Sequence, residues 1–332
     1  MNRDEPAIRW LLNSTEPAVR YFTLTELLDA TSHSHEAVAA LARIPDGPRV
    51  QVLLDGQPVE PRKSPDSPDV HPYKKWDGAH WRLVSLVELG LPAHEPRAVE
   101  AADRVLTWLT SDFHRSKIKA IDGRVWRCAS QEGNALAVCS RLGLIDDPRV
   151  QYLARSLIAW QWPDGGWNCD KHPAANHSSF YESLSPLWGL IEWHRVTRDE
   201  AALQAAAHTV ELFLRHRLFR STTTGAVINP EWLKLHYPLY WHYDILQALV
   251  MLARFDELTD AHGILRDVRV QEALDVLEAR RLPDGCWKAD GFYWALLGKR
   301  ASNVDVVDWG RRGPNEMITL NALRVLKAAG RV

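Results

Sequence analysis

The densest group of chemically capable side chains lies near the middle of the chain. Cys169, His172 and His177 offer a thiol and two imidazoles in the spacing C-x2-H-x4-H. These donor types bind zinc in proteins, and Asp170 or a water would supply the fourth ligand. The spacing therefore predicts a zinc site. The alternative is structural: Cys169 packs inside, His172 faces solvent, and His177 caps the helix that follows.

Carboxylates in the same region and elsewhere are candidates for general acid or base catalysis. A carboxyl group buried among aromatic rings has a raised pKa, and it then donates a proton near neutral pH. A carboxylate at a turn or a helix start equally well serves as a cap or interacts with the helix dipole. The candidates are Asp170, Glu132, Glu182 and Asp244.

Fifteen tryptophans in 332 residues are an unusual excess. Aromatic rings that face a cavity stabilise carbocations through their negative π faces, and they also stack on sugars. Histidines beside such rings are candidate proton carriers, although a histidine on an apolar face is often a hydrogen-bonded core residue. Core packing is the alternative for the whole aromatic set. The predicted cavity lining is Trp76, His80, Trp81, Trp126, Tyr181, Trp241, His242, Tyr243 and Trp294.

Segments of helical period must position these side chains. Several of these segments are apolar on more than one face, which is typical of helices buried inside a double layer. The segments that begin beside the aromatic and acidic residues are 78–90, 131–142, 180–194, 239–255 and 315–329. The N-terminal third predicts further helices over 5–12, 17–29, 35–43 and 49–54. No segment alternates with the period of a β-strand, so we expect an all-α fold.

An internal duplication is the strongest feature of the sequence. Residues 147–170 and 267–290 align without a gap and agree at 11 of 24 positions. Each copy predicts a helix that an Asp opens and a Pro-Asp-Gly turn ends, followed by Trp167 or Trp287. Asp170 in the first copy recurs as Asp290 in the second.

Repeated helical hairpins stack as an open solenoid or close into a ring. A closed ring would bring the starts of the inner helices around one mouth, where the unusual residues would meet. We therefore expect one domain over residues 1–332. The segment 56–71 is rich in Pro, Asp and Ser and is predicted to be a mobile loop.

The two copies resemble a known repeat. Gln161-x-x-x-Gly165-x-Trp167 is similar to the glutamine–tryptophan motif of squalene and oxidosqualene cyclases. Arg281-x-x-x-Gly285-x-Trp287 has the same form with the glutamine replaced, and Gln57 is a candidate third relic. The resemblance implies an α/α toroid of the terpenoid-cyclase and protein-prenyltransferase type, built from antiparallel helical hairpins around a central cavity.

The chain also departs from both families. Cyclases of this type pair two toroids and carry an Asp-x-Asp-Asp acid motif, to which Asp305-Val-Val-Asp308 is the nearest match. Prenyltransferase β subunits are single toroids with an Asp-x-Cys zinc unit, and Asp284-Gly-Cys286 matches that unit. No histidine follows His262 to complete the zinc site.

The resemblance implies an enzyme that acts on an apolar isoprenoid by protonation and carbocation chemistry, as a cyclase, isomerase or lyase. Asp170 or Glu132 would then be the acid. A carbohydrate-active toroid, either a polysaccharide lyase or a glycoside hydrolase, is the alternative, and so is a non-catalytic binding module. The substrate is therefore predicted to be a small apolar or sugar-like molecule.

Charge and composition exclude other classes of function. Forty Lys and Arg residues against 42 Asp and Glu residues give a net charge of −2, so no basic field favours nucleic acid. No apolar run reaches membrane-spanning length, although peripheral membrane contact stays open. The N-terminus is charged where a signal peptide would be apolar, and the four cysteines are widely spaced. We therefore expect a reduced, cytoplasmic protein.

Overall fold

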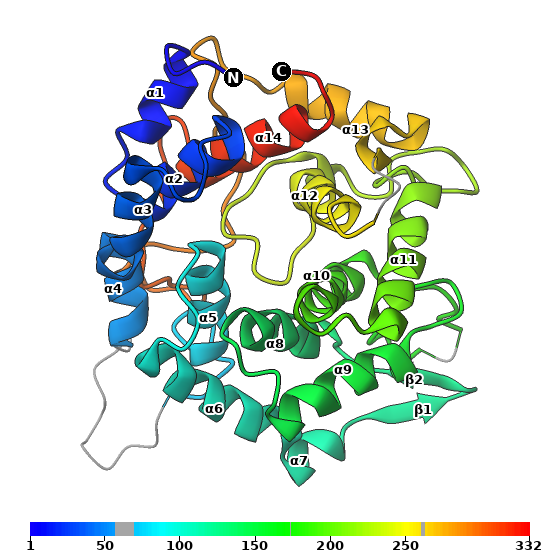
Figure 1. Cartoon of the computed structure of the whole chain (residues 1–332). Helices are drawn as coiled ribbons and strands as arrows, with labels where there is room; N and C mark the ends of the chain where they lie inside the picture. The colour runs from blue at the N-terminus through cyan, green and yellow to red at the C-terminus, as the bar shows by residue number, and fades with distance from the viewer. Residues whose placement is uncertain (57–69, 173, 260–262) are drawn as a thin grey trace.

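The computed structural model describes residues 1–56, 70–172, 174–259 and 263–332. The described residues form fourteen α-helices and a single two-stranded sheet, so the predicted all-α class is confirmed. Figure 1 shows an inner set of helices toward the middle of the molecule and an outer set around it. The inner set is α5 (Ala79–Glu88), α8 (Ser130–Arg141), α10 (Phe180–Thr197), α12 (Ile245–Asp256) and α14 (Glu316–Ala328). The outer set is α4 (Pro48–Asp55), α6 (Pro96–Thr110), α9 (Pro148–Trp160), α11 (Glu200–Arg215) and α13 (Val268–Glu278).

The remaining helices have at most eight residues each. The N-terminal ones are α1 (Pro6–Leu12), α2 (Pro17–Phe22), the π-helical turn η1 (Thr23–Leu27) and α3 (His35–Ala42). The helix predicted over 17–29 is therefore interrupted, because a π-turn replaces its second half. The other short elements are η2 (Ile44–Asp46), α7 (Asp112–Arg115), η3 (Pro230–Leu233) and η4 (Ile264–Arg266).

Most predicted helices are confirmed within a few residues, with α12 the main exception. It begins at Ile245 instead of residue 239, because the preceding chain leaves helical geometry. Tyr240 has φ +57°, which is rare for an aromatic residue, and Asp244 then caps the helix by accepting from the Gln247 amide. The residues before α12 therefore form a loop against the inner helices.

The inner helices are buried on most of their faces, whereas the outer helices bury one stripe. The closest approach joins α8 and α10 at two glycines. A Cβ added to Gly133 would lie 2.3 Å from the Pro186 nitrogen, and one on Gly189 would lie 2.6 Å from the Gly133 carbonyl oxygen. These two helices carry Glu132 and Glu182, so glycine packing brings the two acidic helix starts together.

The duplicated segments fold alike. The indole nitrogen of Trp167 donates to the Leu157 carbonyl at 3.0 Å, and that of Trp287 donates to the Leu277 carbonyl at 2.8 Å. In both copies the glycine amide of the Pro-Asp-Gly turn, Gly165 or Gly285, donates to the carbonyl of the residue before the proline, and both glycines have positive φ. The duplication read from the sequence is therefore structural.

The correspondence extends into the next inner helix. The Trp167 amide donates to Ser183 Oγ at 3.1 Å, and the Trp287 amide donates to Thr319 Oγ1 at 2.9 Å. Ser183 of α10 is therefore equivalent to Thr319 of α14. By the same register Glu182 corresponds to Ile318, while the ungapped alignment pairs Cys169 with Ala289.

A further repeated contact was missed in the sequence. Helices α4, α9 and α13 each carry Arg-Val-Gln in their first turn. The side-chain amides of Gln51, Gln151 and Gln271 donate to the carbonyls of Pro45, Ile145 and Leu265, in each case six residues earlier. This contact fixes the entry of the chain into three outer helices.

The expectation of no β-structure is wrong in one place. Strands β1 (Lys119–Ile121) and β2 (Arg124–Trp126) pair antiparallel around Asp122 and Gly123, which have φ +49° and +75°. Positive φ at both turn residues is the geometry that Asp-Gly favours in a two-residue hairpin. Three-residue strands are too short to show alternation, so the Asp-Gly dipeptide was the usable signal.

The first and last helices of the chain lie together. Helix α14 contacts α1, α2 and η1, and Figure 1 shows the N and C ends on the same side of the molecule. The Lys327 ammonium donates to the carbonyls of Glu26 and Leu27 and pairs with Asp29 at 2.6 Å. No helix in the described part of the chain is long and apolar enough to span a membrane. The predicted mobile loop and Gln57 fall largely on 57–69, outside the described residues.

Candidate functional site

The residues before and at the start of α5 form an aromatic cluster. Trp76 stacks on Tyr240 with ring centres 3.8 Å apart, and Trp81 meets Trp76 edge-on at 4.9 Å. Tyr73 packs on Trp81 at 4.8 Å and on His80 at 5.2 Å. Burial lowers the pKa of the His80 imidazole to about 3, so this ring is neutral. Of the predicted lining residues, Trp76, His80 and Trp81 are thus brought together.

A second set of rings lies beside the first. His242 stacks on Tyr293 at 3.5 Å and on Trp241 at 3.9 Å, and Tyr181 meets Trp241 at 6.1 Å. Trp76 approaches His242 edge-on at 6.2 Å, which joins the two sets. Burial lowers the pKa of His242 to about 4. Tyr181, Trp241 and His242 therefore share one aromatic surface with the α5 residues.

Three predicted lining residues lie elsewhere. Trp126 of β2 pairs with Trp162 in a small separate core. Tyr243 packs among Phe180, Phe213 and Trp232, with its hydroxyl donating to the Leu218 carbonyl at 2.6 Å. Trp294 is buried and donates to the Tyr237 carbonyl at 3.0 Å. Each of these rings packs in the core, as expected if it serves core packing and does not line a cavity.

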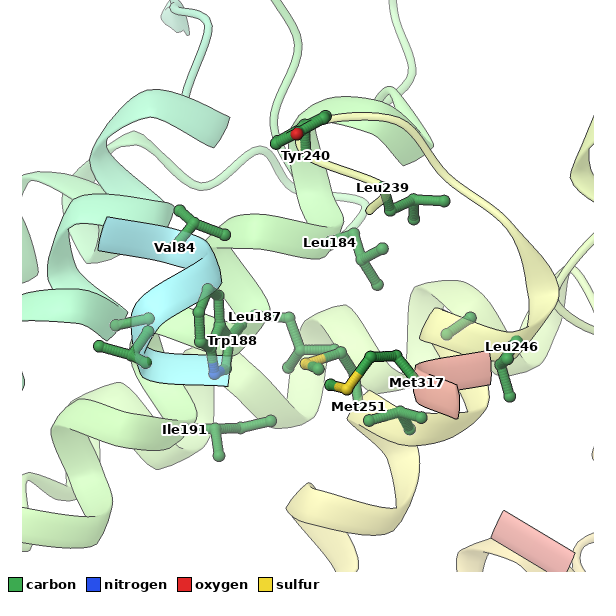
Figure 2. Close-up of a cluster of buried hydrophobic side chains, with 14 of the residues drawn as sticks. Val84, Leu184, Leu187, Trp188, Ile191, Leu239, Tyr240, Leu246, Met251 and Met317 are labelled. Atoms are coloured by element: carbon green, nitrogen blue, oxygen red, sulfur yellow. The ribbon is translucent and has the colours of Figure 1, made fainter. Parts of the chain in front are cut away.

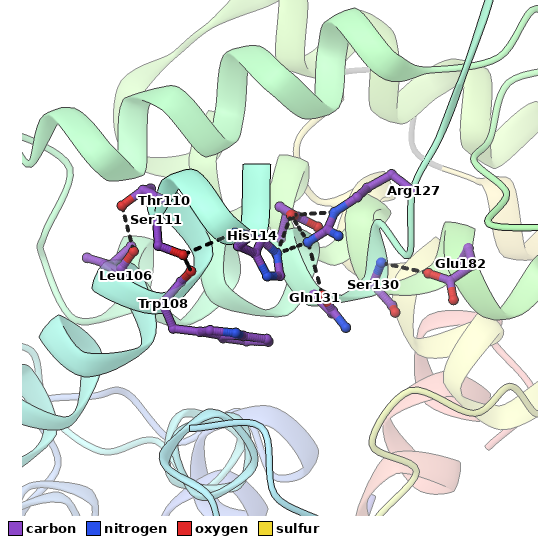
Figure 3. A network of polar contacts seen from close by, with 10 residues as sticks. Leu106, Trp108, Thr110, Ser111, His114, Arg127, Ser130, Gln131 and Glu182 are labelled. Atoms are coloured by element: carbon purple, nitrogen blue, oxygen red, sulfur yellow. Dashed lines mark hydrogen bonds and ion pairs between the residues drawn. The ribbon is translucent and has the colours of Figure 1, made fainter. Parts of the chain in front are cut away.

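Glu132 belongs to a buried ion-pair network at the start of α8, part of which Figure 3 shows. Arg127 Nη2 lies 2.6 Å from Glu132 Oε1, contacts His114 Nε2 and donates to Gln131 Oε1 at 3.0 Å. Burial raises the pKa of Glu132, and the positive charge of Arg127 opposes that rise. Burial together with Arg127 lowers the pKa of His114 to about 4. Glu132 is therefore held as the partner of a cation, and this arrangement disfavours a role as proton donor.

A second group, of two half-buried thiols and one buried carboxylate, joins three separate segments. The Sγ atoms of Cys128 and Cys169 and a carboxylate oxygen of Glu182 lie within 4.8 Å of one another. Cys169 Sγ donates to Glu182 Oε1 at 3.5 Å, and the Ser130 amide donates to Glu182 Oε2 at 3.0 Å (Figure 3). A hydrogen bond from Cys169 lowers the pKa of the Cys128 thiol, whereas burial raises the pKa of Glu182.

The predicted zinc ligands do not converge. His172 and His177 are exposed, and within the described ranges neither belongs to a group of three ligand side chains. The ring of His172 accepts from the Ala174 amide, and that of His177 lies 3.2 Å from Asn176 Oδ1. The cluster around Cys169 thus replaces both predicted histidines with Cys128 and Glu182.

Two other predicted site residues occupy turns or caps. Asp170 is exposed and accepts from the His172 amide at 3.0 Å, so the burial that would make it an acid is missing. Asp244 is fully buried, but its two oxygens accept from the Gln247 and His236 amides. Asp244 therefore caps α12 and fixes the loop before it.

A further buried acidic side chain is Asp305, in the segment between Trp287 and α14. It is 2% exposed, and burial raises the pKa of its carboxyl from 3.8 to about 7. Its Oδ2 accepts from the Trp309 indole at 2.9 Å and from the Tyr240 hydroxyl, and its Oδ1 accepts from the Val307 amide at 3.0 Å. Tyr240 in turn stacks on Trp76. A carboxyl group with this pKa is partly protonated at neutral pH.

Apolar side chains gather next to Tyr240. Figure 2 shows Tyr240 and Leu239 at the edge of a cluster in which side chains of α5, α10, α12 and α14 approach one another. Its labelled members from those helices are Val84, Leu184, Leu187, Trp188, Ile191, Leu246, Met251 and Met317. All are buried, so the surroundings of Tyr240 on this side are apolar.

Among the cavities in the described part of the chain, two of the larger ones lie outside this cluster. A cavity of about 610 Å³ borders the start of α10 and is lined by Asp164, Asp170, His177, Tyr181 and Trp232, among others. A second, of about 530 Å³, lies at the other ends of the inner helices. It carries charges of both signs, including Arg141, Glu192, Arg254 and Arg324.

Comparisons with known proteins add no assignment. No family model matches the chain, and no curated protein matches its sequence.

Sequence reasoning missed several members of these clusters. Tyr73, Cys128 and Trp309 lie outside the predicted helices, so no helix-start pattern marked them. Asp305 was noted only as a mismatch to an acid motif. The sequence did contain one signal for it, since an Asp flanked by Val304, Val306 and Val307 is predicted to lie in apolar surroundings.

Proposed function

We propose that the chain is an α/α toroid of the terpenoid-cyclase type, and that it protonates an apolar, isoprenoid-like substrate. The single observation that carries the proposal is Asp305, a buried carboxyl whose pKa is about 7 and which the Tyr240 hydroxyl contacts. The two layers of helices and the glutamine–tryptophan repeat support the toroid. This assignment replaces Asp170 and Glu132 as the acid.

The surrounding rings suit a cationic intermediate. Protonation of a carbon–carbon double bond by Asp305, directly or through Tyr240, leaves a carbocation and a carboxylate. Trp76 and Trp81 lie beside Tyr240 and supply π faces that stabilise such a cation. The apolar cluster of Figure 2 excludes water that would otherwise quench the cation. Return of a proton from the cation to the carboxylate would complete an isomerisation or cyclisation.

The test is deuterium incorporation from heavy water into a panel of linear and cyclic isoprenoids. The wild-type chain is expected to label at least one of them, and Asp305→Asn to reduce the rate by about 10²–10⁴-fold because the acid is lost. Asp308→Asn is the matched control, since Asp308 is exposed in the same segment and accepts a hydrogen bond from the Gly310 amide. Turnover that persists in Asp305→Asn would refute the assignment.

The cavity at the start of α10 favours a second candidate, a carbohydrate ligand. Its lining combines carboxylates and hydroxyl groups with the rings of Tyr181 and Trp232, which is the composition that binds sugars by hydrogen bonds and stacking. Binding of oligosaccharides would be measured by calorimetry for the wild type and for Trp232→Ala. Sugar binding that Trp232→Ala abolishes would support this candidate. Absence of binding across the panel would remove it.

A further inference from the structure

We propose that Cys128, Cys169 and Glu182 bind one zinc ion and leave a fourth coordination position for water or a substrate group. Two thiolates and one carboxylate are ligands that zinc prefers, and three protein ligands with one open position are typical of catalytic zinc sites. The three side chains come from the β2–α8 connection, the turn after Trp167 and the first turn of α10. The fold, and not local sequence, assembles the group.

The separations suit tetrahedral coordination. Zinc bonds of about 2.3 Å to sulfur and about 2.1 Å to oxygen place neighbouring sulfur and oxygen ligands about 3.6 Å apart. Cys169 Sγ and Glu182 Oε1 are 3.5 Å apart, and all three ligand atoms lie within 4.8 Å of one another. Small side-chain rotations therefore suffice to enclose an ion. Cys128 and Cys169 are both partly exposed, so an ion can reach them from solvent.

The carboxylate is oriented by a partner of its own. The Ser130 amide holds Glu182 Oε2 at 3.0 Å, which directs Oε1 toward the thiols. Outer contacts of this kind fix the geometry of metal-binding carboxylates. The packing of Gly133 against Pro186 keeps α8 and α10 close enough for this contact.

The second copy of the duplication shows that the repeat does not require these residues. Ala289 stands where the first copy has Cys169, and Ile318 stands where it has Glu182. Both copies nevertheless make the same tryptophan and turn contacts. Cys169 and Glu182 are therefore particular to the first copy, and the repeated helices and turns form without them.

The experiment measures zinc in the purified full chain by mass spectrometry after gel filtration under reducing conditions. We expect about one zinc per wild-type chain and less than about a tenth of that in Cys169→Ala, Cys128→Ala and Glu182→Gln. With cobalt in place of zinc, the wild type should show a sulfur-to-metal charge-transfer absorption that Cys169→Ala lacks. Circular dichroism and thermal melting establish that each variant folds, and Ala289 indicates that alanine is tolerated at this position.

Two controls separate this site from its competitors. Cys286→Ala removes a buried thiol of the second copy, and His172→Ala/His177→Ala removes the exposed imidazoles. Both are expected to keep full zinc occupancy. A wild type without zinc, retention of zinc in folded Cys169→Ala, or loss of zinc in the double histidine variant would each overturn the proposal. Thiol titration that finds a Cys128–Cys169 disulfide in place of metal would overturn it as well.

Discussion

The two copies of the duplicated unit share their framework and differ where each tryptophan turn connects to an inner helix. In the first copy this connection is short, runs from Asn168 to Ser179, and adds the Cys169 thiol beside Glu182. In the second copy it runs from Lys288 to Asn315 and contains the buried Asp305. The shared contacts are those of the helices and turns. The helices and turns of the scaffold are therefore repeated, whereas each connection carries its own chemically reactive side chains.

The largest expected effect tests the shared framework. Trp167→Ala and Trp287→Ala each remove a fully buried indole and its hydrogen bond to the preceding helix. Each should lower the free energy of unfolding by about 3–5 kcal/mol, as large-to-small core changes do. Urea denaturation measures both. A loss of unfolding free energy in only one of the two variants would show that the two copies do not share this stabilising contact.

Residues 182 and 318 are equivalent in the two copies but differ in type. Giving each position the residue of the other copy should have unequal effects on the free energy of unfolding. Ile318→Glu places a carboxylate among apolar neighbours at a fully buried position and should cost about 3–5 kcal/mol of unfolding free energy. The reverse change, Glu182→Ile, removes a buried acid and should cost no more than about 1–2 kcal/mol, because the lost Ser130 contact is offset by the desolvation that is avoided. Chemical denaturation of both variants in the absence of metal measures the two losses of unfolding free energy. Equal costs would show that Glu182 is part of the framework.

The buried carboxyl of Asp305, in the second connection, should make the free energy of unfolding depend on pH. The carboxyl of Asp305 has a pKa of about 7 in the folded chain and 3.8 ordinarily, so its ionisation opposes folding. The wild type should therefore lose roughly 3–4 kcal/mol of unfolding free energy relative to Asp305→Asn as the pH rises from about 4 to about 7, with little further relative loss above that. Denaturation midpoints at pH 5 and pH 8 measure it. A constant difference between the two proteins would contradict the raised pKa.

The smallest effect concerns the residue that differs within the shared motif. The side-chain amide of Gln161 donates to the carbonyls of Gly165 and Ala205, whereas Arg281 makes one long contact, 3.4 Å, to the Gly285 carbonyl. Gln161→Ala should cost about 1–2 kcal/mol and Arg281→Ala less than about 0.5 kcal/mol. Thermal melting of the two variants distinguishes these values. Reversal of the order would mean that the cation–π contact of Arg281 with Trp287 outweighs the bonds of Gln161.

The helices and the duplication were predictable because both are local. The 3.6-residue period and the Pro-Asp-Gly turns lie within short windows, so α5, α8 and α10 begin within a residue or two of their predicted starts. The loop before α12 was not predictable, because Tyr240 takes a left-handed backbone conformation that its own sequence does not favour.

The candidate site was predictable only in part, since it is assembled over long sequence separations. Glu182 and Cys169 were recognised individually, but their meeting with Cys128 depends on the β2–α8 connection and on the close packing of α8 and α10. His172 and His177 matched a ligand spacing, yet they lie on an exposed stretch of the connection. The burial of Asp305 could not be predicted, because one of its partners, Tyr240, lies 65 residues earlier, although Trp309 is only four residues away.

The contact between the last helix and the first turns has a consequence for synthesis of the chain. Lys327 of α14 binds carbonyls about 300 residues earlier, and α14 also packs on α1 and α2. At about 5–20 residues per second a ribosome needs roughly 15–60 s to make that length of chain. During this interval the apolar faces of α1 and α2 that α14 covers have no native partner. The nascent chain therefore has a window in which chaperones compete with aggregation, and the window closes only when α14 emerges.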